Sequence, residues 1–362
     1  MINGKTKQHF IKSFEIKNFR GIVNSGKIEI PACTQWVFLT GENGYGKTSV
    51  LQALAVGLYG KENVNALSSE ERDNAKITVC LQDDKIFRGY PKKVFKNVMT
   101  YGADRLKRDS KSSNQPTDSL FNKETYFLPM DDILIQFMLQ IQEEKYKEAF
   151  QELQNIFCKI IPDLDSISMS EGTLKEVLYK ERFSENLLPY DALSTGFRSW
   201  ITLIGDIISR YYQFNHIDSI SKMEWIVLID EFDLHLHPKW QQKLPKVLSE
   251  IFPNIQFIVS THSPIPLLGA PEKAVFLKVV RIKEEGIKIQ NLDYVKVRNL
   301  TPNTILTSPI FDYDEFIPEN ENDFLNQSVE DLYKEEVFNQ ILNQKLQKMS
   351  KEEENLLEEL IK

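Results

Sequence analysis

Residues 41–48 read GENGYGKT and fit the pattern G-x-x-x-x-G-K-[ST] of a phosphate-binding loop. Its glycines let the backbone curl so that several N–H groups point at phosphate oxygens. The helix that follows directs the positive end of its dipole at the same anion. In this pattern Lys47 reaches the β- and γ-phosphates, and the Thr48 hydroxyl is a ligand for Mg²⁺. The loop residues predicted to contact the nucleotide are Asn43, Gly44, Gly46, Lys47, Thr48 and Ser49.

Two adjacent acids follow an apolar stretch much further along the chain. The sequence WIVLID at 225–230 reads as a buried strand that ends in Asp230, and Glu231 comes next. An acid at the end of such a strand can hold Mg²⁺ through water, and its neighbour can polarise the attacking water. We therefore predict that Asp230 joins Thr48 as a metal ligand and that Glu231 is catalytic.

Two more segments carry groups suited to phosphate. Ser194 and Gly196, in LSTG at 193–196, offer a hydroxyl and a helix N-terminus to a γ-phosphate. His262, in STHSP after the next predicted strand, can sense that phosphate through its imidazole and is predicted to be catalytic. His235 and His237 lie just past the two acids, but we do not expect zinc there, because no third ligand follows and the spacing is not H-E-x-x-H.

The composition limits the classes of protein. The chain has 362 residues, of which 41% are hydrophobic and 27% charged, as in soluble globular proteins. No apolar run is long enough to span a membrane, and the N-terminus lacks the apolar core of a signal peptide, so we expect a cytoplasmic protein without a membrane partner. The three cysteines are scattered and odd in number, which favours reduced thiols over disulfides or metal ligands.

The elements that must hold these residues alternate between strands and helices. Trp36–Leu39 is predicted as the strand before the loop and Thr48–Tyr59 as the helix after it. Gln256–Ser260 is the next buried strand after Trp225–Asp230, and His237–Ile251 is the helix between them. This alternation indicates an α/β fold with a mainly parallel sheet. Two further strands are predicted within residues 10–30. Ala75–Leu81 and Lys85–Tyr90 are predicted to form an antiparallel pair, and Phe95–Tyr101 is predicted to be another strand.

The chain divides into a large domain and a tail. Residues 1–310 are predicted to form one domain, with an inserted and largely helical lobe at about 105–185. Residues 311–331 contain eight Asp or Glu and no Lys or Arg, which indicates an extended acidic linker. Residues 332–362 are predicted to be helical.

The basic residues are concentrated in one segment. Residues 85–111 contain nine Lys or Arg against two Asp, whereas the whole chain carries a net charge of −8. Such a run is more often a solvated face than a nucleic-acid contact, so nucleic acid is only a possible partner.

These motifs together resemble the ABC-type ATPase heads of the RecF, SMC and overcoming-lysogenisation families. The matching segments are FEIKNFRG at 14–21, the phosphate loop, the signature at 193–196, the strand and acids at 226–231, the loop at 234–237, and His262. The resemblance implies an α/β, ABC-type P-loop NTPase head with a mixed sheet, an inserted helical lobe and C-terminal helices. It also implies bound ATP and Mg²⁺, and adds Arg20 to the nucleotide-binding residues. In these families the signature of one subunit caps the ATP held by another, which implies a homodimer or higher oligomer with composite sites.

Within this group the sequence is most similar to the ATPases of Septu anti-phage systems, including their retron-associated forms. The similarity lies in YGADR at 101–105, DEFDLHLHPKWQQKLP at 230–245, FPNIQFIVSTHSP at 252–264 and LTPNTILTS at 300–308. Such ATPases work with a separate nuclease of the HNH type, so the resemblance implies that partner. Overcoming-lysogenisation proteins instead carry a C-terminal Toprim nuclease, but no ordered set of strand-ending acids follows Lys278, so no intrinsic nuclease site is predicted.

One element of the resembling heads is replaced here. They usually present a glutamine where the antiparallel strands meet the helical lobe, and this chain has Tyr101–Arg105 at that point. Gln82 is the nearest alternative, but it comes one strand too early. We therefore expect Tyr101–Arg105 to take the place of the glutamine.

The leading hypothesis is an ATPase that holds and regulates a nuclease in phage defence. An alternative is a DNA-repair or DNA-tethering ATPase without a nuclease. The third is an ATPase subunit of a transporter, which the signature LSTGF in place of LSGGQ disfavours.

Overall fold

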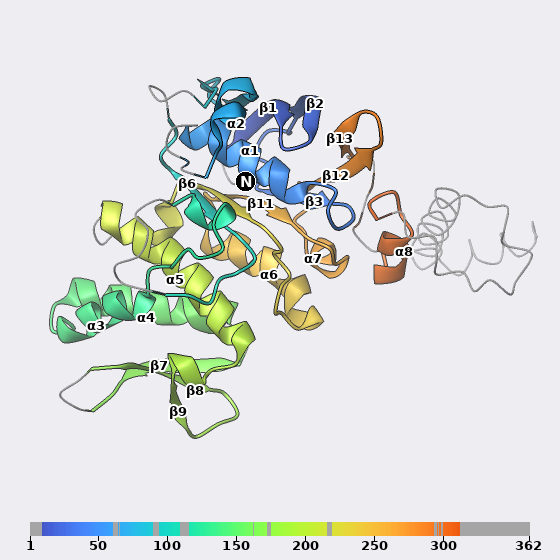
Figure 1. Ribbon diagram of the computed structural model, residues 1–362. Coiled ribbons are helices and arrows are strands. Elements are labelled where there is room, and N and C mark those ends of the chain that lie inside the picture. Colours follow the sequence, from blue (N-terminus) through green and yellow to red (C-terminus); the bar gives the residue numbers. More distant parts are fainter. Residues whose placement is uncertain are drawn as a thin grey trace, which may run out of the picture. The chain divides into compact units, whose positions relative to one another are not determined.

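The structure is a computed structural model (Figure 1). It describes residues 9–311 except 61–63, 65, 90–93, 109–115, 162, 172–174, 216–218, 293–294, 296 and 298–299, and it does not describe the side chains of 214 and 215. Two compact units divide the chain, Met1–Asn291 and Leu292–Lys362. The first unit contains every predicted site residue, and the second contains α8 (Pro302–Leu306).

Six strands form the central sheet of the first unit, in the order β13-β12-β3-β11-β10-β6. Five of them are parallel, namely β12 (Val275–Ile282), β3 (Trp36–Thr40), β11 (Gln256–Ser260), β10 (Ile226–Ile229) and β6 (Val98–Tyr101). The sixth, β13 (Gly286–Asn291), is antiparallel to β12. Every residue of β3, β6, β10 and β11 is buried, because helices and a second sheet cover both faces. The predicted α/β class with a mixed sheet is confirmed.

A second, antiparallel sheet has the order β2-β1-β4-β5. Its strands are β2 (Ile22–Glu29), β1 (Ile11–Phe19), β4 (Lys76–Leu81) and β5 (Ile86–Phe87). The predicted strand at 95–101 does not join this sheet. It forms β6, which pairs with β10 at the edge of the central sheet.

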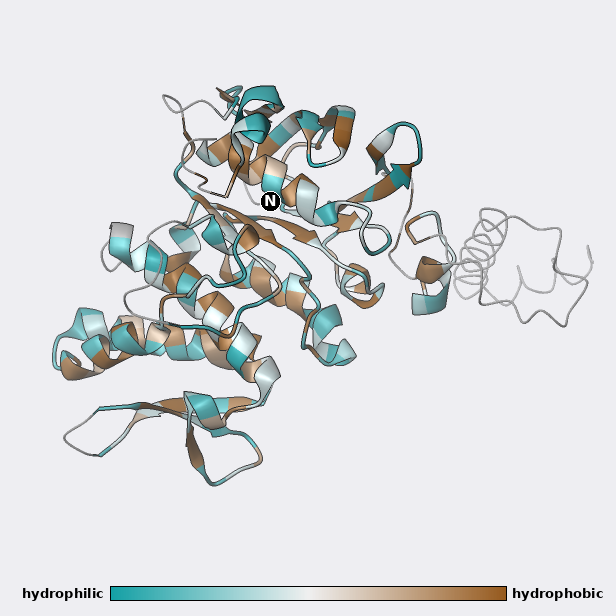
Figure 2. Cartoon of the chain, in the orientation of Figure 1, coloured by the Kyte–Doolittle hydropathy of each residue, from teal (hydrophilic) through white to brown (hydrophobic). Residues whose placement is uncertain are grey.

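The helix α1 (Lys47–Tyr59) lies between the two sheets (Figure 1). Residues 50–58 of this helix are all buried, so the helix is covered on every side rather than on one face only. Val37 and Leu39 of β3 face the core around α1. On the opposite face of β3, the indole N–H of Trp36 donates to Ser249 of α6 (Pro238–Ile251), 2.8 Å away. Figure 2 shows the hydrophobic residues gathered on the central strands and on the inner sides of these helices.

The inserted lobe is helical only in its middle part. Its helices are α3 (Met130–Leu139) and α4 (Glu144–Ile160), and the predicted apolar stripe of α4 is buried. The described residues of the lobe before α3 contain no α-helix. After α4 follows a three-stranded antiparallel sheet of β7 (Leu164–Met169), β8 (Val177–Glu181) and β9 (Leu187–Pro189). The lobe was expected to be largely helical, but the short alternation of buried residues in β8 is a strand pattern.

The helix α5 (Thr195–Asn215) follows the lobe and carries the signature at its start. The helix α6 begins at Pro238, with His237 as its N-cap, close to the predicted start at 237. Shorter elements complete the described part of the chain: α2 (Ser69–Asn74), α7 (Ile265–Leu268) and the 3-10 turns Asp118–Leu120, Tyr190–Ala192 and Ile220–Lys222.

Several predictions fall at or beyond the limits of the described residues. The predicted domain boundary after residue 310 lies within the second unit. Apart from Phe311, the acidic linker at 311–331 and the helical segment at 332–362 are outside the described residues. The basic segment at 85–111 is described only in part. Among the described residues, no helix combines the length and the apolar character that crossing a membrane requires.

Candidate nucleotide site

The phosphate loop connects β3 to α1, as predicted. Gly41, Gly44 and Gly46 have φ angles of 129°, 78° and 103°, in the region that favours glycine. A Cβ atom at Gly41 would lie 2.2 Å from the carbonyl oxygen of Val279, so only glycine fits between the loop and β12. Gly46 is the N-cap of α1, and Asn43 and Gly44 are exposed at the tip of the loop. The first N–H groups of α1 have no partners within the helix, so they are available to an anion at the loop.

Lys47 is folded back onto its own loop. Its Nζ atom donates to the carbonyl oxygens of Gly41 at 2.7 Å and Glu42 at 2.8 Å, and it lies 3.3 Å from Nδ1 of His262. Burial lowers the pKa of Lys47 to about 8, although nearby acids, Asp230 first among them, oppose this shift. The predicted residues Lys47 and His262 therefore meet, from segments 215 positions apart.

His262 follows β11 and is exposed on the same side as the loop. Partial desolvation and the cation of Lys47 lower its pKa, so the imidazole is neutral at neutral pH. A neutral imidazole can both donate and accept a hydrogen bond, which suits a residue that senses phosphate.

Thr48 and Asp230 form the part of the site that fits a metal ion. The Thr48 hydroxyl donates to Oδ2 of Asp230 at 2.6 Å, and the Ser260 hydroxyl donates to Oδ1 at 2.5 Å. Hydroxyl and carboxylate oxygens are the ligands that Mg²⁺ prefers, and it is usually held by one or two carboxylates together with substrate phosphates. Within the described part of the chain, no group of three or more His, Cys, Asp or Glu could hold a metal by protein ligands alone. The donor set thus fits Mg²⁺ brought in with a nucleotide.

Glu231 stands on a strained turn directly after Asp230. Its φ of 48° is in the left-handed region, which is unusual for a residue other than glycine. Its N–H donates to the Ser260 hydroxyl at 2.8 Å, and its carbonyl oxygen accepts from Nη2 of Arg105 at 2.6 Å. Both peptide groups of Glu231 are therefore held in place.

The signature residues occupy a different cleft from the phosphate loop. Ser194 precedes α5, and its hydroxyl accepts a hydrogen bond from the N–H of Phe197 at 3.4 Å. A Cβ atom at Gly196 would lie 2.7 Å from the carbonyl oxygen of His235, so the glycine allows the loop after the two acids to pack closely. Ser194 and Gly196 line a cleft of about 670 Å³ together with His235 and His237, and no phosphate-loop residue lines it.

Arg20 has partners outside the loop. Its Nε atom donates to Glu71 of α2 at 2.7 Å, and its Nη1 atom donates to Gln52 of α1 at 2.5 Å. The structure thus ties Arg20 to the turn of α1 after Thr48, and its predicted contact with the nucleotide stays a prediction. Ser49 is half-buried on α1, and its predicted contact with the nucleotide likewise stays a prediction.

Two residues of the site were missed in the sequence. Ser260 ends β11 and holds both Asp230 and Glu231, and its only signal was a polar residue at the end of a buried strand. Arg105 is 1% exposed and lies beneath the same two acids. It belongs to the segment Tyr101–Arg105 that was predicted to replace the glutamine.

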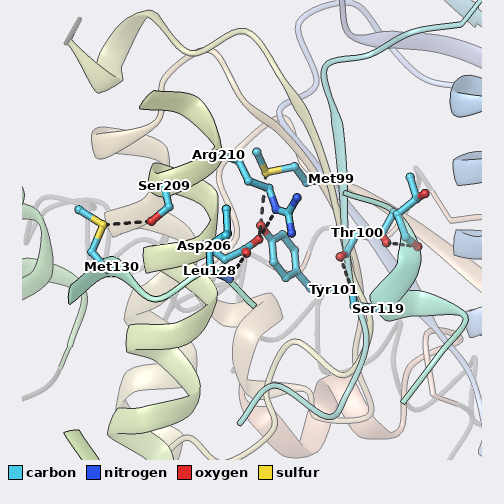
Figure 3. A network of polar contacts seen from close by, with 10 residues as sticks. Met99, Thr100, Tyr101, Ser119, Leu128, Met130, Asp206, Ser209 and Arg210 are labelled. Atoms are coloured by element: carbon cyan, nitrogen blue, oxygen red, sulfur yellow. Dashed lines mark hydrogen bonds and ion pairs between the residues drawn. The ribbon is translucent and has the colours of Figure 1, made fainter. Parts of the chain in front are cut away.

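Tyr101, at the other end of that segment, belongs to a buried polar network (Figure 3). Its hydroxyl donates to Oδ2 of Asp206 at 2.9 Å, and Nε of Arg210 donates to the same oxygen at 2.7 Å. The N–H of Leu128, before α3, donates to Oδ1 of Asp206 at 2.8 Å. The carbonyl oxygen of Tyr101 also accepts from the N–H of Asp230 at 2.8 Å. The network thus joins the strand that ends at Asp230 to α5 and to the inserted lobe.

Asp206→Asn is expected to destabilise the fold strongly. The side chains of Asp206 and Arg210 are only 2% and 7% exposed, so the substitution removes the negative charge that lies 2.7 Å from a buried guanidinium. Breaking a buried pair in this way costs about 3–5 kcal/mol. The free energy of unfolding in urea measures the effect. Asp84→Asn is the matched control, because Asp84 pairs with Lys12 at the surface, where solvent screens such pairs and they contribute little to stability. Equal effects of the two substitutions would contradict this account.

Comparisons with known proteins agree with the sequence pattern. The chain is 28% identical to the Septu protein PtuA of Bacillus mycoides (strain KBAB4) over 391 residues, which cover 95% of this chain and 51% of that protein. It is 36% identical to the Retron Vc95 probable ATPase of Vibrio cholerae serotype O1 biovar El Tor over 154 residues, or 42% of this chain and 27% of that protein. This chain thus spans about half the length of the first relative and less of the second. The predicted resemblance to Septu and retron-associated ATPases is confirmed.

Among solved structures, an Smc head bound to the C-terminal winged-helix domain of ScpA matches with a TM-score of 0.48 and 14% identity, over 78% of this chain and 98% of that one. The family described as "AAA ATPase domain" matches residues 61–265. Since this match covers more than half of the chain, the chain belongs to the AAA ATPase domain family.

Proposed function

We propose that this chain binds ATP with Mg²⁺, hydrolyses it to ADP and phosphate, and regulates a separate nuclease of the HNH type in anti-phage defence. One observation carries the ATPase part. The hydroxyl of Thr48 lies 2.6 Å from the carboxylate of Asp230, although 182 positions separate the two residues in the chain. A phosphate loop, a strand-ending acid and a following Glu231 are the parts that phosphoryl transfer to water needs.

Each residue has a distinct role in this proposal. Lys47 leaves the loop carbonyls and binds the β- and γ-phosphates, while the loop N–H groups hold the rest of the chain of phosphates. Thr48 and Asp230 would hold Mg²⁺, which would supply positive charge to the phosphates. Glu231 accepts a proton from the attacking water, and His262 contacts the γ-phosphate.

The signature cleft supports composite sites. Ser194 and Gly196 line a cleft without any phosphate-loop residue, so they would reach a nucleotide held by a second copy. We therefore propose an ATP-dependent homodimer or higher oligomer.

The defence role is supported by the similarity to Septu and retron proteins. The nuclease partner rests on the sequence resemblance to Septu ATPases, and nucleic acid remains a possible partner through the basic segment.

The test has two parts. Phosphate release from ATP by the full chain should require Mg²⁺ and stop in EDTA, and a chain that neither binds nor hydrolyses ATP would refute the ATPase. Co-purification with an HNH nuclease encoded beside the gene tests the partnership. A neighbouring recombination or permease gene, without a nuclease, would instead favour DNA repair or transport.

ATP binding should take up protons at alkaline pH. In the free protein the pKa of Lys47 is about 8, so near pH 8.5 most of the lysine is neutral. Phosphate oxygens favour the charged ammonium and raise its pKa, so binding near that pH should take up about half a proton or more. At pH 7 the lysine is already charged, and the uptake through Lys47 should be small. Titration calorimetry in two buffers of different ionisation enthalpy measures the uptake, and equal uptake at both pH values would contradict this role.

A further inference from the structure

Arg105 is a buried cation that contacts the main chain of both acids. Its Nη2 atom donates to the carbonyl oxygens of Asp230 and Glu231, each at 2.6 Å. Its Nε atom donates to the carbonyl oxygen of Gly102 at 2.7 Å. Its Nη1 atom is buried and has no hydrogen-bond partner among the described residues. Burial lowers the pKa of Arg105 to about 10, so the group stays charged at neutral pH.

This arrangement is costly for a residue that only fills space. A buried cation is expensive even when it is paired, and an unpartnered N–H adds the desolvation penalty of that group. Among the described residues, the Nε and Nη2 atoms of the guanidinium donate to main-chain oxygens and not to the carboxylate of either acid. Its contacts therefore act on the backbone of the acids and leave their carboxylates to other partners.

The backbone that Arg105 holds is strained. Residues other than glycine in sparsely populated backbone regions persist only where the surroundings enforce them, and they cluster at functional sites. Glu231 has a φ of 48°, with Ser260 holding its N–H and Arg105 holding its carbonyl oxygen. Since these two contacts fix the backbone on either side of Glu231, they determine the direction in which its side chain leaves the turn.

The segment that carries Arg105 is itself anchored. At its start, the hydroxyl of Tyr101 donates to Asp206 (Figure 3). The carbonyl oxygen of Tyr101 accepts from the N–H of Asp230. The guanidinium thus extends from a segment tied at both ends to the strand that bears the acids.

We propose that Arg105 is a positioning residue for ATP hydrolysis, which fixes the main chain at Asp230 and Glu231 and so directs the Glu231 carboxylate at the attacking water. This inference rests on the proposed ATPase function. The segment Tyr101–Arg105 would then act directly on the main chain of the two acids. It occupies the place where the ABC-type ATPase heads that the sequence resembles carry a glutamine.

The experiment compares Arg105→Gln and Arg105→Lys with Arg108→Gln in the full chain. Arg108 is a suitable control because it is a partly buried arginine three residues away that pairs with Asp131 at 3.0 Å instead of the two acids. Arg105→Gln should lower kcat about 100-fold, as a misplaced catalytic group does, and leave the dissociation constant of ATP unchanged. Arg105→Lys keeps the positive charge but loses the planar guanidinium with its several N–H donors. Its kcat should therefore be lower than that of the wild type and higher than that of Arg105→Gln.

A second readout needs no nucleotide. Hydrogen exchange of the free protein should be faster at the amides of Glu231 and Phe232 in Arg105→Gln than in the wild type, and unchanged there in Arg108→Gln. If Arg105→Gln does not fold, both kcat and hydrogen exchange are measured on Arg105→Lys instead.

The outcomes are distinct. A wild-type kcat in the Arg105 variants overturns the inference. The inference is also overturned if Arg105→Gln and Arg108→Gln show the same combined loss of kcat, ATP affinity and melting temperature. A wild-type chain that binds no ATP refutes the proposed function and this inference with it. A wild-type chain that hydrolyses ATP, beside an unaffected Arg105→Gln, refutes the inference alone.

Discussion

Lys47→Ala is expected to abolish measurable ATP binding. The Nζ atom of Lys47 now bonds to the carbonyl oxygens of Gly41 and Glu42, at the position where phosphates would enter. Hydrogen bonds to charged groups contribute about 1.5–3 kcal/mol each. Two such bonds to phosphate correspond to about 100- to 10,000-fold in the dissociation constant, since each tenfold is about 1.4 kcal/mol.

Direct binding of ATP with Mg²⁺ by calorimetry measures this loss. ATP should also raise the melting temperature of the wild type and not that of Lys47→Ala, because a ligand stabilises only a fold that binds it. Lys123→Ala is the control, as Lys123 is exposed and lies on the loop before α3. Wild-type affinity in Lys47→Ala would mean that the loop does not bind the nucleotide.

The part of the site that lies on continuous apolar strands was predictable. Trp36–Leu39 and Gln256–Ser260 are short apolar runs bounded by glycine or polar residues, and they became β3 and β11. The carboxyl ends of parallel strands meet at one edge of a sheet, so the loop, Asp230 and His262 had to converge there. The contacts of Thr48 with Asp230 and of Lys47 with His262 follow from that rule.

The side chains that hold this site from behind were not predictable. Arg105 reaches the carbonyl oxygen of Asp230 from 125 positions away, and Ser260 reaches its carboxylate from 30 positions away. No local pattern marks such contacts, because they depend on the order of strands in the sheet. That order places β6 next to β10, although sequence pattern alone gave the strand at 95–101 no partner.

The short strands of the inserted lobe could not be identified from the sequence pattern, whereas its long helix could. The apolar stripe of α4 extends over several turns and identifies the helix. In contrast, β8 has five residues and β9 three, and β7 pairs with β8 through a shift in register that interrupts the alternation. Strands this short carry too few residues for period two to stand out from a loop.

Glu231→Gln is expected to keep ATP binding and lose turnover. Glutamine preserves the shape and much of the hydrogen bonding of the side chain but cannot accept a proton as a carboxylate does. The groups proposed to bind the nucleotide do not change: Lys47, Thr48 and Asp230 stay in place, and Ser260 still holds the N–H of residue 231. General-base catalysis contributes about 100- to 10,000-fold to a rate, so kcat should fall by that factor. Glu148→Gln, an exposed change on α4, is the control and should hydrolyse ATP at the wild-type rate.

The same variant tests the composite sites. If the Ser194 and Gly196 of one copy cap the ATP bound to another, the uncleaved nucleotide binds the associated state and favours it by mass action. Glu231→Gln should therefore accumulate as a dimer or higher oligomer with ATP and Mg²⁺, and dissociate when ATP is replaced by ADP. Light scattering at several protein concentrations measures the mass of the particle in each state. Normal hydrolysis by the variant would show that Glu231 is not catalytic. A particle mass that does not respond to ATP would refute sites shared between copies, because the cleft at Ser194 and Gly196 would then have no nucleotide to cover.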